Sequence, residues 1–519
     1  MKKAIYLIIA LIGLSAPSCS DSMLDFSPTD SGSGKELLKS ASTAITSVNG
    51  VYRSMWTAGW STTANTHQCF GIAAYNLALD CMADDLIMQS QGNGWFWGDH
   101  CYNVKSNYTS SAFRSYDVWY ANYKWIANVN YIIDAEPEMA GTEADVAYVA
   151  GQAYAIRALC YLNLATWFSR APYNSLTGAS RWNEPCVPVY TTGTSIDTGG
   201  QPRESLRTVY GRIDQDIDRA IELLEKARET TLAENNKSHI NLYVALGIKS
   251  RACLAEGDWD GAFKAAKRVI DEGGYAVGTK SDLTGGMNSL DKQNVMWGAG
   301  IQVADQAGGY AGFFTHMDNK EGAYAKSAPK LISKQLYNRI SATDIRRDWW
   351  DPSDKESPYV SKKFSFANVP SFLGDYIYMR VEEMYFTAAE AALRLDDLKS
   401  ARELMNTVMA ERDPGYSANN RSGTLLGATT TTWTGSFLEN ILTHRRIELW
   451  GEYGRLFDVR RLGQGIDRRT DDGFSEECIS MMNRRNVNIT KADTYDWVLT
   501  IPKAELDANP NINEEDQNP

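Results

Sequence analysis

A run of aromatic and polar residues in the first third of the chain could recognise a sugar. It comprises Asn93, Trp95, Phe96, Trp97 and Asp99, with a glycine on either side of the three aromatic residues. Three adjacent rings point in different directions and do not all bury against one element, so at least one is expected to face solvent. An indole can stack on the apolar face of a sugar ring while the amide and the carboxylate bond its hydroxyl groups. The alternative is that the rings fold back and plug a loop over the helices.

A second segment of the same kind lies in the middle of the chain. It is rich in glycine and offers Asp305, Tyr310, Phe313 and Phe314 to a ligand. A third aromatic group falls at helical spacing and is therefore predicted to belong to the core. Its members are Trp119, Tyr120, Tyr123 and Trp125.

Signatures of catalysis are missing from the sequence. The five histidines are dispersed without an HExxH pair, and neither a GxSxG elbow nor a GxxxxGK[ST] phosphate loop occurs. Asp84 and Asp85 could supply the two carboxylates of a glycoside hydrolase, but adjacent side chains of a regular element point apart, which favours a pair at a helix end. No cysteine or histidine pair has the spacing of a metal site, so neither a metal nor a cofactor is predicted.

Charged residues on apolar helical stripes are predicted to form internal ion pairs. Arg157 lies on one such stripe, while Arg445, Glu448 and Glu452 share a face of another through their i, i+3, i+7 spacing. A buried charge without a partner costs several kcal/mol, so each of these residues is expected to find an opposite charge.

The composition is that of a large, acidic, globular chain. Its 519 residues include 52 basic and 64 acidic side chains, which gives a net charge of −12. This length allows one large unit or up to about three ordinary domains. The acidic balance argues against nucleic-acid binding, which depends on Lys and Arg. The 15 tryptophans and 27 tyrosines fit either stacking surfaces or aromatic-rich helix packing.

The N-terminus is predicted to be a lipoprotein signal. Two lysines, an apolar run over residues 4–14 and small residues up to Cys19 are typical of a secretory signal peptide, which would comprise residues 1–18. Small residues ending at a cysteine resemble a bacterial lipobox, in which Cys19 is acylated, with palmitate for example, and anchors the chain. Residues 19–34 would form a flexible tether. The alternative is an ordinary cleaved signal with an incidental cysteine.

The rest of the chain, residues 35–519, is predicted to be one mainly α-helical domain. Apolar residues at spacings of three and four indicate helices near 35–55, 113–133, 145–168, 205–228 and 239–271. A turn followed by spaced alanines after Gly257, with a similar pattern after Asp397, resembles a tetratricopeptide helix pair. Three segments lack this period and are expected to be loop-rich and to form a ligand-binding half. They are 56–110, 169–203 and 274–375.

Seven short motifs occur in a fixed order along the chain. They are Asn49–Arg53, Arg157–Leu164, Tyr378–Tyr385, Ala388–Ala391, Arg445–Leu449, Arg455–Arg461 and Ile501–Leu506. Together with the lipobox they resemble the SusD/RagB family, the surface nutrient-binding lipoproteins of Bacteroidetes-type outer membranes. The sequence departs from the family at His444, a position where a glutamate is usual.

The resemblance implies a fold and a function. The fold would be a SusD-like body with four tetratricopeptide-like helix pairs and a more irregular half, whose ligand site lies in loops of the first third and the middle of the chain. The protein would be lipid-anchored at the surface of the outer membrane, bind carbohydrate without catalysis, and deliver oligosaccharide to a SusC-like TonB-dependent transporter. The alternatives are capture of a peptide or another nutrient, an all-α glycoside hydrolase, or a purely structural repeat scaffold.

Overall fold

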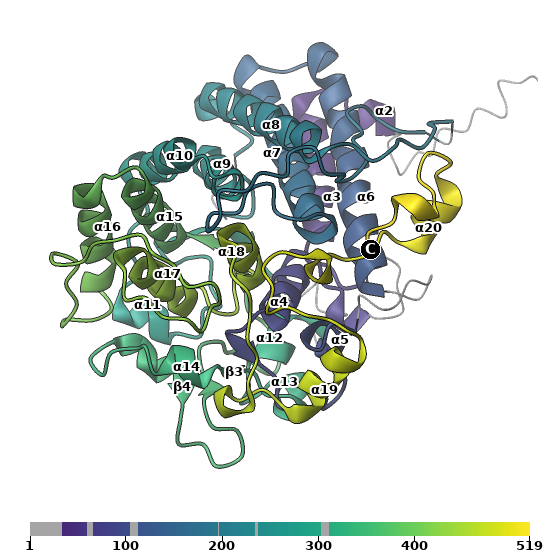
Figure 1. Ribbon diagram of the computed structural model, residues 1–519. Helices are drawn as coiled ribbons and strands as arrows, with labels where there is room; N and C mark the ends of the chain where they lie inside the picture. Colours follow the sequence, from purple (N-terminus) through teal and green to yellow (C-terminus); the bar gives the residue numbers. More distant parts are fainter. Residues whose placement is uncertain (1–33, 60–65, 104–112, 196, 234–236, 303–310) are drawn as a thin grey trace, which may run out of the picture.

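The computed structural model is mainly α-helical, as predicted (Figure 1). It describes residues 34–519 with the exception of 60–65, 104–112, 196, 234–236 and 303–310. The principal helices are α3 (Ala41–Ser54), α4 (Ile72–Met82), α6 (Phe113–Ala135), α7 (Glu143–Phe168), α8 (Leu206–Lys226), α9 (Leu242–Glu256), α10 (Trp259–Glu272), α15 (Val381–Arg394), α16 (Leu398–Ala410), α17 (Phe437–Glu448), α18 (Arg455–Leu462) and α19 (Glu476–Arg484). The shorter ones are α2 (Gly34–Leu37), α5 (Trp97–His100), α11 (Lys280–Thr284), α12 (Phe313–Met317), α13 (Ala323–Ser327), α14 (Lys334–Tyr337) and α20 (Lys503–Ala508).

Short strands form two small antiparallel sheets. The first has the order β1 (Leu86–Ile87), β3 (Leu331–Ile332), β5 (Val360–Ser361) and β4 (Trp350–Asp351), and the second pairs β2 (Val295–Ala299) with β6 (Tyr376–Arg380). In the first sheet Leu86 lies opposite Ile332. Strand β1 belongs to the segment 56–110, and β3, β4 and β5 belong to the segment 274–375. This sheet therefore joins the two segments.

Helix pairs packed side by side form the upper part of the molecule in Figure 1. Helix α7 packs on α8, α9 on α10, and α15 on α16, and α10 also contacts α15. Gly257 ends α9 with a φ of +76°, a left-handed conformation that suits glycine, and the Asp258 carboxylate caps α10 by accepting a hydrogen bond from the backbone N–H of Gly261. Ala262 and Ala266 are fully buried between the helices. The tetratricopeptide-like pattern of the sequence is thereby confirmed.

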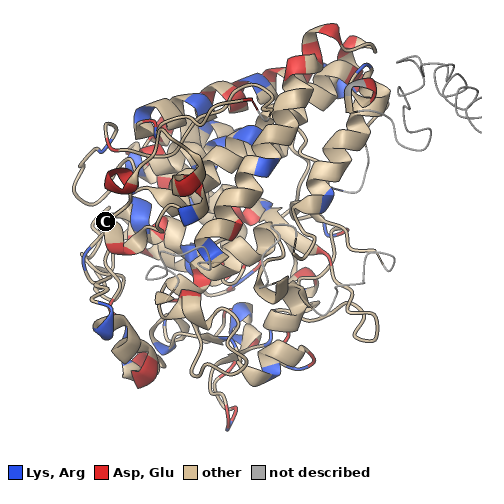
Figure 2. Cartoon of the chain, turned by 90° about the vertical axis from the view of Figure 1, so that its right-hand side faces the viewer, with Lys and Arg blue, Asp and Glu red and all other residues tan. Residues whose placement is uncertain are grey.

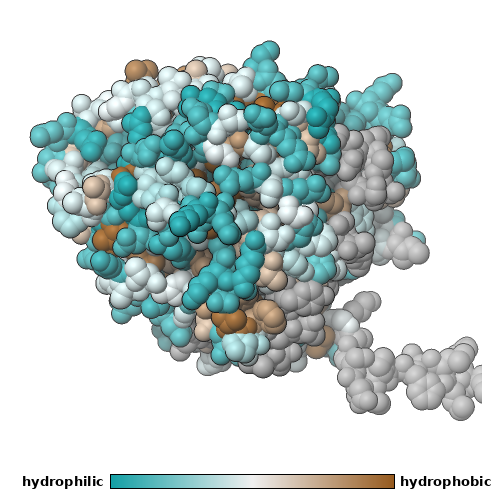
Figure 3. Space-filling model, turned by 90° about the horizontal axis from the view of Figure 1, so that it is seen from below, coloured by the Kyte–Doolittle hydropathy of each residue, from teal (hydrophilic) through white to brown (hydrophobic). Residues whose placement is uncertain are grey.

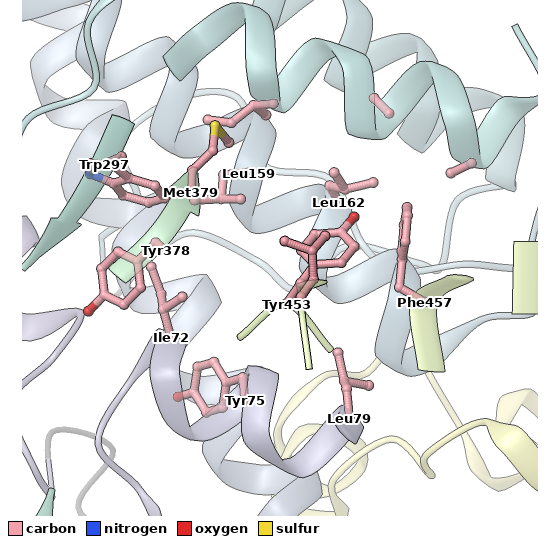
Figure 4. Packing of buried hydrophobic residues seen from close by; sticks show 14 of the residues in the cluster. Ile72, Tyr75, Leu79, Leu159, Leu162, Trp297, Tyr378, Met379, Tyr453 and Phe457 are labelled. Carbon is pink, nitrogen blue, oxygen red and sulfur yellow. The ribbon is translucent and has the colours of Figure 1, made fainter. Parts of the chain in front are cut away.

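The segment 56–110 differs from the expected loop because it contains the buried helix α4. This helix is apolar almost all round and buried on nearly every side, so its sequence shows no amphipathic period that would reveal it. Side chains of α4 point into the core toward α7 in Figure 4, where Ile72, Tyr75 and Leu79 face Leu159 and Leu162. In their described parts, 169–203 and 274–375 hold only irregular backbone and elements of at most five residues.

A cluster of buried charges joins the helix pairs to the loop-rich half. Its members, here called the Glu448 cluster, are Asp344, Arg346, Lys363, Arg380, Glu382, Arg412, Glu448 and Glu452, all fully buried except Glu452. The Glu448 carboxylate accepts hydrogen bonds from Arg346 Nη1 (3.1 Å), Arg380 Nη1 (2.9 Å) and Arg412 Nε (2.9 Å). Figure 2 shows such basic and acidic turns next to one another inside the molecule.

The internal ion pairs predicted from the sequence are confirmed. Besides Glu448, Arg157 pairs with Asp216 at 2.7 Å and Arg445 with Asp458 at 2.8 Å. At the position that departs from the family pattern, His444 Nδ1 accepts a hydrogen bond from Arg346 Nη2 (2.8 Å). Burial, helped by the charge of Arg346, lowers the pKa of His444 well below 6.5, so the imidazole is neutral at neutral pH.

The three arginines also keep Glu448 ionised. Burial by itself raises the pKa of the Glu448 carboxyl, but the charges of Arg412, Arg380 and Arg346 outweigh burial and hold the pKa well below 4.5. Because this pKa is lower in the folded protein than in the unfolded chain, the stabilisation is present above about pH 4.5 and is lost as the pH falls further.

Glu448→Gln is expected to lower the free energy of unfolding by about 3–5 kcal/mol at pH 7, because it leaves buried arginines without their counter-charge. The difference from the wild-type protein should narrow as the pH is lowered below about 4.5. Denaturant unfolding over a pH series measures both effects. The control is Glu222→Gln, which removes an exposed pair with Lys226 and should leave the stability nearly unchanged. Equal losses for the two variants would contradict a structural role for Glu448.

Candidate functional site

Trp95 lies at the surface in a cluster of aromatic rings. Its half-buried indole stacks on the ring of His67, with centroids 4.8 Å apart and planes 15° apart, and it meets the edge of Tyr324 at 6.2 Å. His67 comes from the short 3₁₀ helix Thr66–Gln68 and Tyr324 from α13, and a hydrogen bond joins the Tyr324 hydroxyl to His67 Nδ1. Together with Asn93 these residues are called the Trp95 cluster.

Asn93 and its neighbouring glycines hold the indole in place. The Asn93 side chain donates a hydrogen bond to the backbone oxygen of Tyr324 (3.2 Å) and accepts one from the backbone N–H of Trp95 (3.1 Å). Gly92 has a φ of +51°, and a Cβ there would lie 2.4 Å from the backbone oxygen of Ser327. Only glycine therefore allows this turn to approach α13 so closely.

The remaining residues of the first predicted segment belong to the core. Phe96 and Trp97 are only 0% and 3% exposed, and Asp99 is fully buried in a two-bond pair with Arg114 (2.8 and 3.0 Å). Phe96 has a left-handed φ of +61°. This conformation turns the chain so that the rings of Phe96 and Trp97 point inward while Trp95 stays at the surface. We therefore leave Phe96, Trp97 and Asp99 out of the candidate site: a buried ring or a paired carboxylate offers a ligand no contact.

The second predicted segment is likewise buried where it is described. Phe313 and Phe314 of α12 are 8% and 2% exposed, and both rings pack against Tyr376 of β6. Their apolar contacts assign them to the core. Asp305 and Tyr310, and also Cys19, lie outside the described residues.

The ring of His316 behind the Trp95 cluster is uncharged. His316 is fully buried, stacks on Phe70 at 5.7 Å and contacts the ring of Tyr324 at 4.9 Å. Burial, assisted by the charge of Lys330, lowers the pKa of His316 well below 6.5, so this ring is neutral. On the face seen from below in Figure 3, small separate hydrophobic patches lie among hydrophilic residues. The His316 ring that contacts Tyr324 therefore adds no charge to the cluster.

Two residues of the cluster could not be found from the sequence. His67 was one of five dispersed histidines and Tyr324 one of 27 tyrosines, and they are separated by 257 positions. Of the third aromatic group, Trp119 and Trp125 are buried as predicted, whereas Tyr120 and Tyr123 are half-buried. No sequence spacing would have shown that difference.

Asp84 and Asp85 follow α4, and both form ion pairs with arginines. Arg446 Nη2 lies 3.1 Å from Asp84 and 2.6 Å from Asp85, and Arg455 contacts both carboxylates. Both acids are buried, so neither can reach a glycosidic bond. Within the described residues no group of three His, Cys, Asp or Glu side chains could hold a metal ion.

Two family models match the chain. The SusD family model matches residues 353–519, and a model described as "Starch-binding associating with outer membrane" matches residues 43–254. No curated protein matches the sequence.

Solved structures resemble the chain over nearly its whole length. A SusD-like carbohydrate binding protein from Bacteroides vulgatus is 25% identical, with a TM-score of 0.72 over 92% of this chain and 98% of its own. A SusD superfamily protein from Bacteroides thetaiotaomicron is 22% identical, with a TM-score of 0.71 over 92% and 100%. Surface glycan-binding protein A from Bacteroides uniformis is 17% identical, with a TM-score of 0.64 over 92% and 99%. The last two likenesses concern the fold alone.

Trp97→Ala should act on stability, because it empties a buried site. The expected loss is about 3–5 kcal/mol in the free energy of unfolding, measured by denaturant titration. A variant whose stability is unchanged would show that Trp97 is not packed in the core.

Proposed function

We propose that this chain, which belongs to the SusD/RagB family of non-catalytic, outer-membrane-associated glycan-binding proteins, captures oligosaccharide at the Trp95 cluster. It would pass the oligosaccharide to a SusC-like TonB-dependent transporter. The observation that carries the proposal is the half-buried indole of Trp95, held in a fixed orientation by His67 and Asn93. A ring that is already positioned loses little side-chain freedom when a sugar stacks on it.

The chemistry of the cluster fits a sugar. The indole face can cover the apolar side of a pyranose, and Tyr324 and Asn93 lie beside it with groups that bond hydroxyls. The 25% identical relative is described as a carbohydrate binding protein, which agrees with this ligand class.

Trp95→Ala is expected to weaken oligosaccharide binding about tenfold, equivalent to about 1.4 kcal/mol, because one stacking contact is lost. Isothermal titration of the purified mature chain measures the affinity, after a glycan array has identified the bound oligosaccharide. The matched control is Trp182→Ala, which removes another half-buried indole, packed on Tyr210 outside the cluster. Unchanged affinity in Trp95→Ala would contradict the proposed site, and binding of peptides in place of glycans would contradict the proposed ligand.

Cys19 is proposed to attach the protein to the outer membrane through acylation. Among the described residues, no helix is both long and apolar enough to cross a membrane. A lipidated cysteine would supply the attachment, and more than one acyl chain would make it stable.

Cys19→Ala, expressed in the native host, should move the protein from the membrane fraction to the soluble fraction, because its attachment would depend on the lipid. Immunoblotting of separated fractions measures the distribution, with Cys253→Ala as the control for loss of a buried thiol. Retention of Cys19→Ala on the membrane would contradict lipid anchoring.

A further inference from the structure

A pocket of about 350 Å³ lies beside α6, away from the elements that form the Trp95 cluster. Its walls come from α6, from α20 and from Tyr190, Thr194, Ser195 and Thr198. Both helices lie at the right of Figure 1. The volume is at the small end of ligand pockets in proteins, which span about 300–1,000 Å³. The residues used below are Trp119, Tyr120, Tyr123, Lys124, Tyr190 and Glu505, and the site is called the α6 pocket.

Aromatic rings at different angles line the α6 pocket. Tyr123 meets Tyr190 edge to face at 5.9 Å and 88°, and it contacts Trp119 at 4.9 Å. The Tyr123 hydroxyl donates to the backbone oxygen of Pro188 (2.8 Å), which fixes the ring. Trp119 is 5% exposed, whereas Tyr120 and Tyr123 are half-buried, so tyrosine surfaces form the accessible wall.

Polar groups of opposite charge stand next to these rings. The Glu505 carboxylate accepts one hydrogen bond from Trp119 Nε1 (3.2 Å) and one from Asn509 Nδ2 (2.8 Å), on different oxygens. A carboxylate can accept about four hydrogen bonds, so Glu505 is oriented and can still accept from a ligand. Lys124 Nζ lies 5.5 Å from the centre of the Tyr120 ring and donates to its hydroxyl (3.3 Å).

The wall that contains Tyr190 is held in place by hydrogen bonds from α6 and α7. Asn130 Nδ2 donates to the backbone oxygens of Tyr190 (3.2 Å) and Thr192 (2.9 Å), and Arg157 Nη1 donates to that of Thr191 (2.8 Å). Because Arg157 is itself paired with Asp216, the buried ion pair supports the wall of the pocket. The pocket is thus formed before any ligand arrives.

From this arrangement we infer that the α6 pocket is a second carbohydrate subsite, which takes a short neutral saccharide. Tyrosine faces supply stacking, and one acid, one base and the hydroxyl groups of Thr194 and Thr198 supply hydrogen bonds without a net charge. The pocket shares no lining residue with the Trp95 cluster. The inference rests on the proposed glycan binding, and it implies that a long glycan touching both sites binds more tightly than either site alone.

The test uses isothermal titration of the mature chain with maltoheptaose, xylohexaose and cellohexaose. Tyr120→Ala and Glu505→Gln should each weaken binding about threefold to tenfold at the second subsite. Both substitutions are also made in the Trp95→Ala variant, in which only the second subsite is expected to bind the oligosaccharide. Tyr385→Ala, which removes a half-buried tyrosine of α15, is the control and should leave the affinity unchanged. Thermal midpoints of all variants are compared, so that loss of folding is distinguished from loss of contact.

Weak binding that persists in Trp95→Ala and falls by a further factor of about three to ten when Tyr120→Ala is added would support the second subsite. If Trp95→Ala alone abolishes all binding while Tyr120→Ala leaves the wild-type affinity unchanged, the subsite is overturned and the proposed function stands. If none of the three oligosaccharides binds even the wild-type chain, the subsite is overturned as well, and the glycan array then decides the proposed function separately.

Discussion

The carboxylate of Glu448 is the point on which the two halves of the molecule depend. Three arginines from separate stretches of the chain converge on it, at the end of β6, after α16 and in the segment before β4. Buried charges in a low-dielectric interior tolerate few alternative arrangements. Arg380 fixes the end of β6, and Tyr376 at its other end packs against Phe70 and Phe314, which lie behind the Trp95 cluster. Strand β6 therefore connects the Glu448 cluster at one end with the residues behind the candidate site at the other.

Sequence patterns revealed the helices that are apolar on one face and missed helix α4, which is apolar almost all round. Helix α10 shows spaced alanines and a capping aspartate, and it was predicted with its turn. Helix α4 is surrounded by protein on nearly all sides, so its sequence lacks an amphipathic period, and the interval that contains it was predicted to be loop-rich. At the site, Trp95 was found because three adjacent aromatic residues are unusual. The directions of the three rings depend on the left-handed backbone of Phe96, which the residue type does not predict.

The motifs that carry the resemblance to the SusD/RagB family and the residues that form the candidate site are different sets. Arg157, Arg445 and Glu448 belong to motifs and act as internal ion pairs. Trp95, His67 and Tyr324 belong to no motif: Trp95 lies in a turn, and the other two lie on short helices joined by irregular backbone. A scaffold held by buried charges can keep its shape while such surface residues change. This separation explains why the resemblance to the family does not by itself fix the ligand.

The composition of the Glu448 cluster has a consequence for how the protein meets a membrane. Its four cations and four anions cancel, so the cluster contributes nothing to the net charge of −12. The excess of negative charge must reside elsewhere in the chain, and an anionic lipid surface would repel it over a distance of about 8 Å at physiological salt. The net charge of the chain therefore opposes its approach to such a surface.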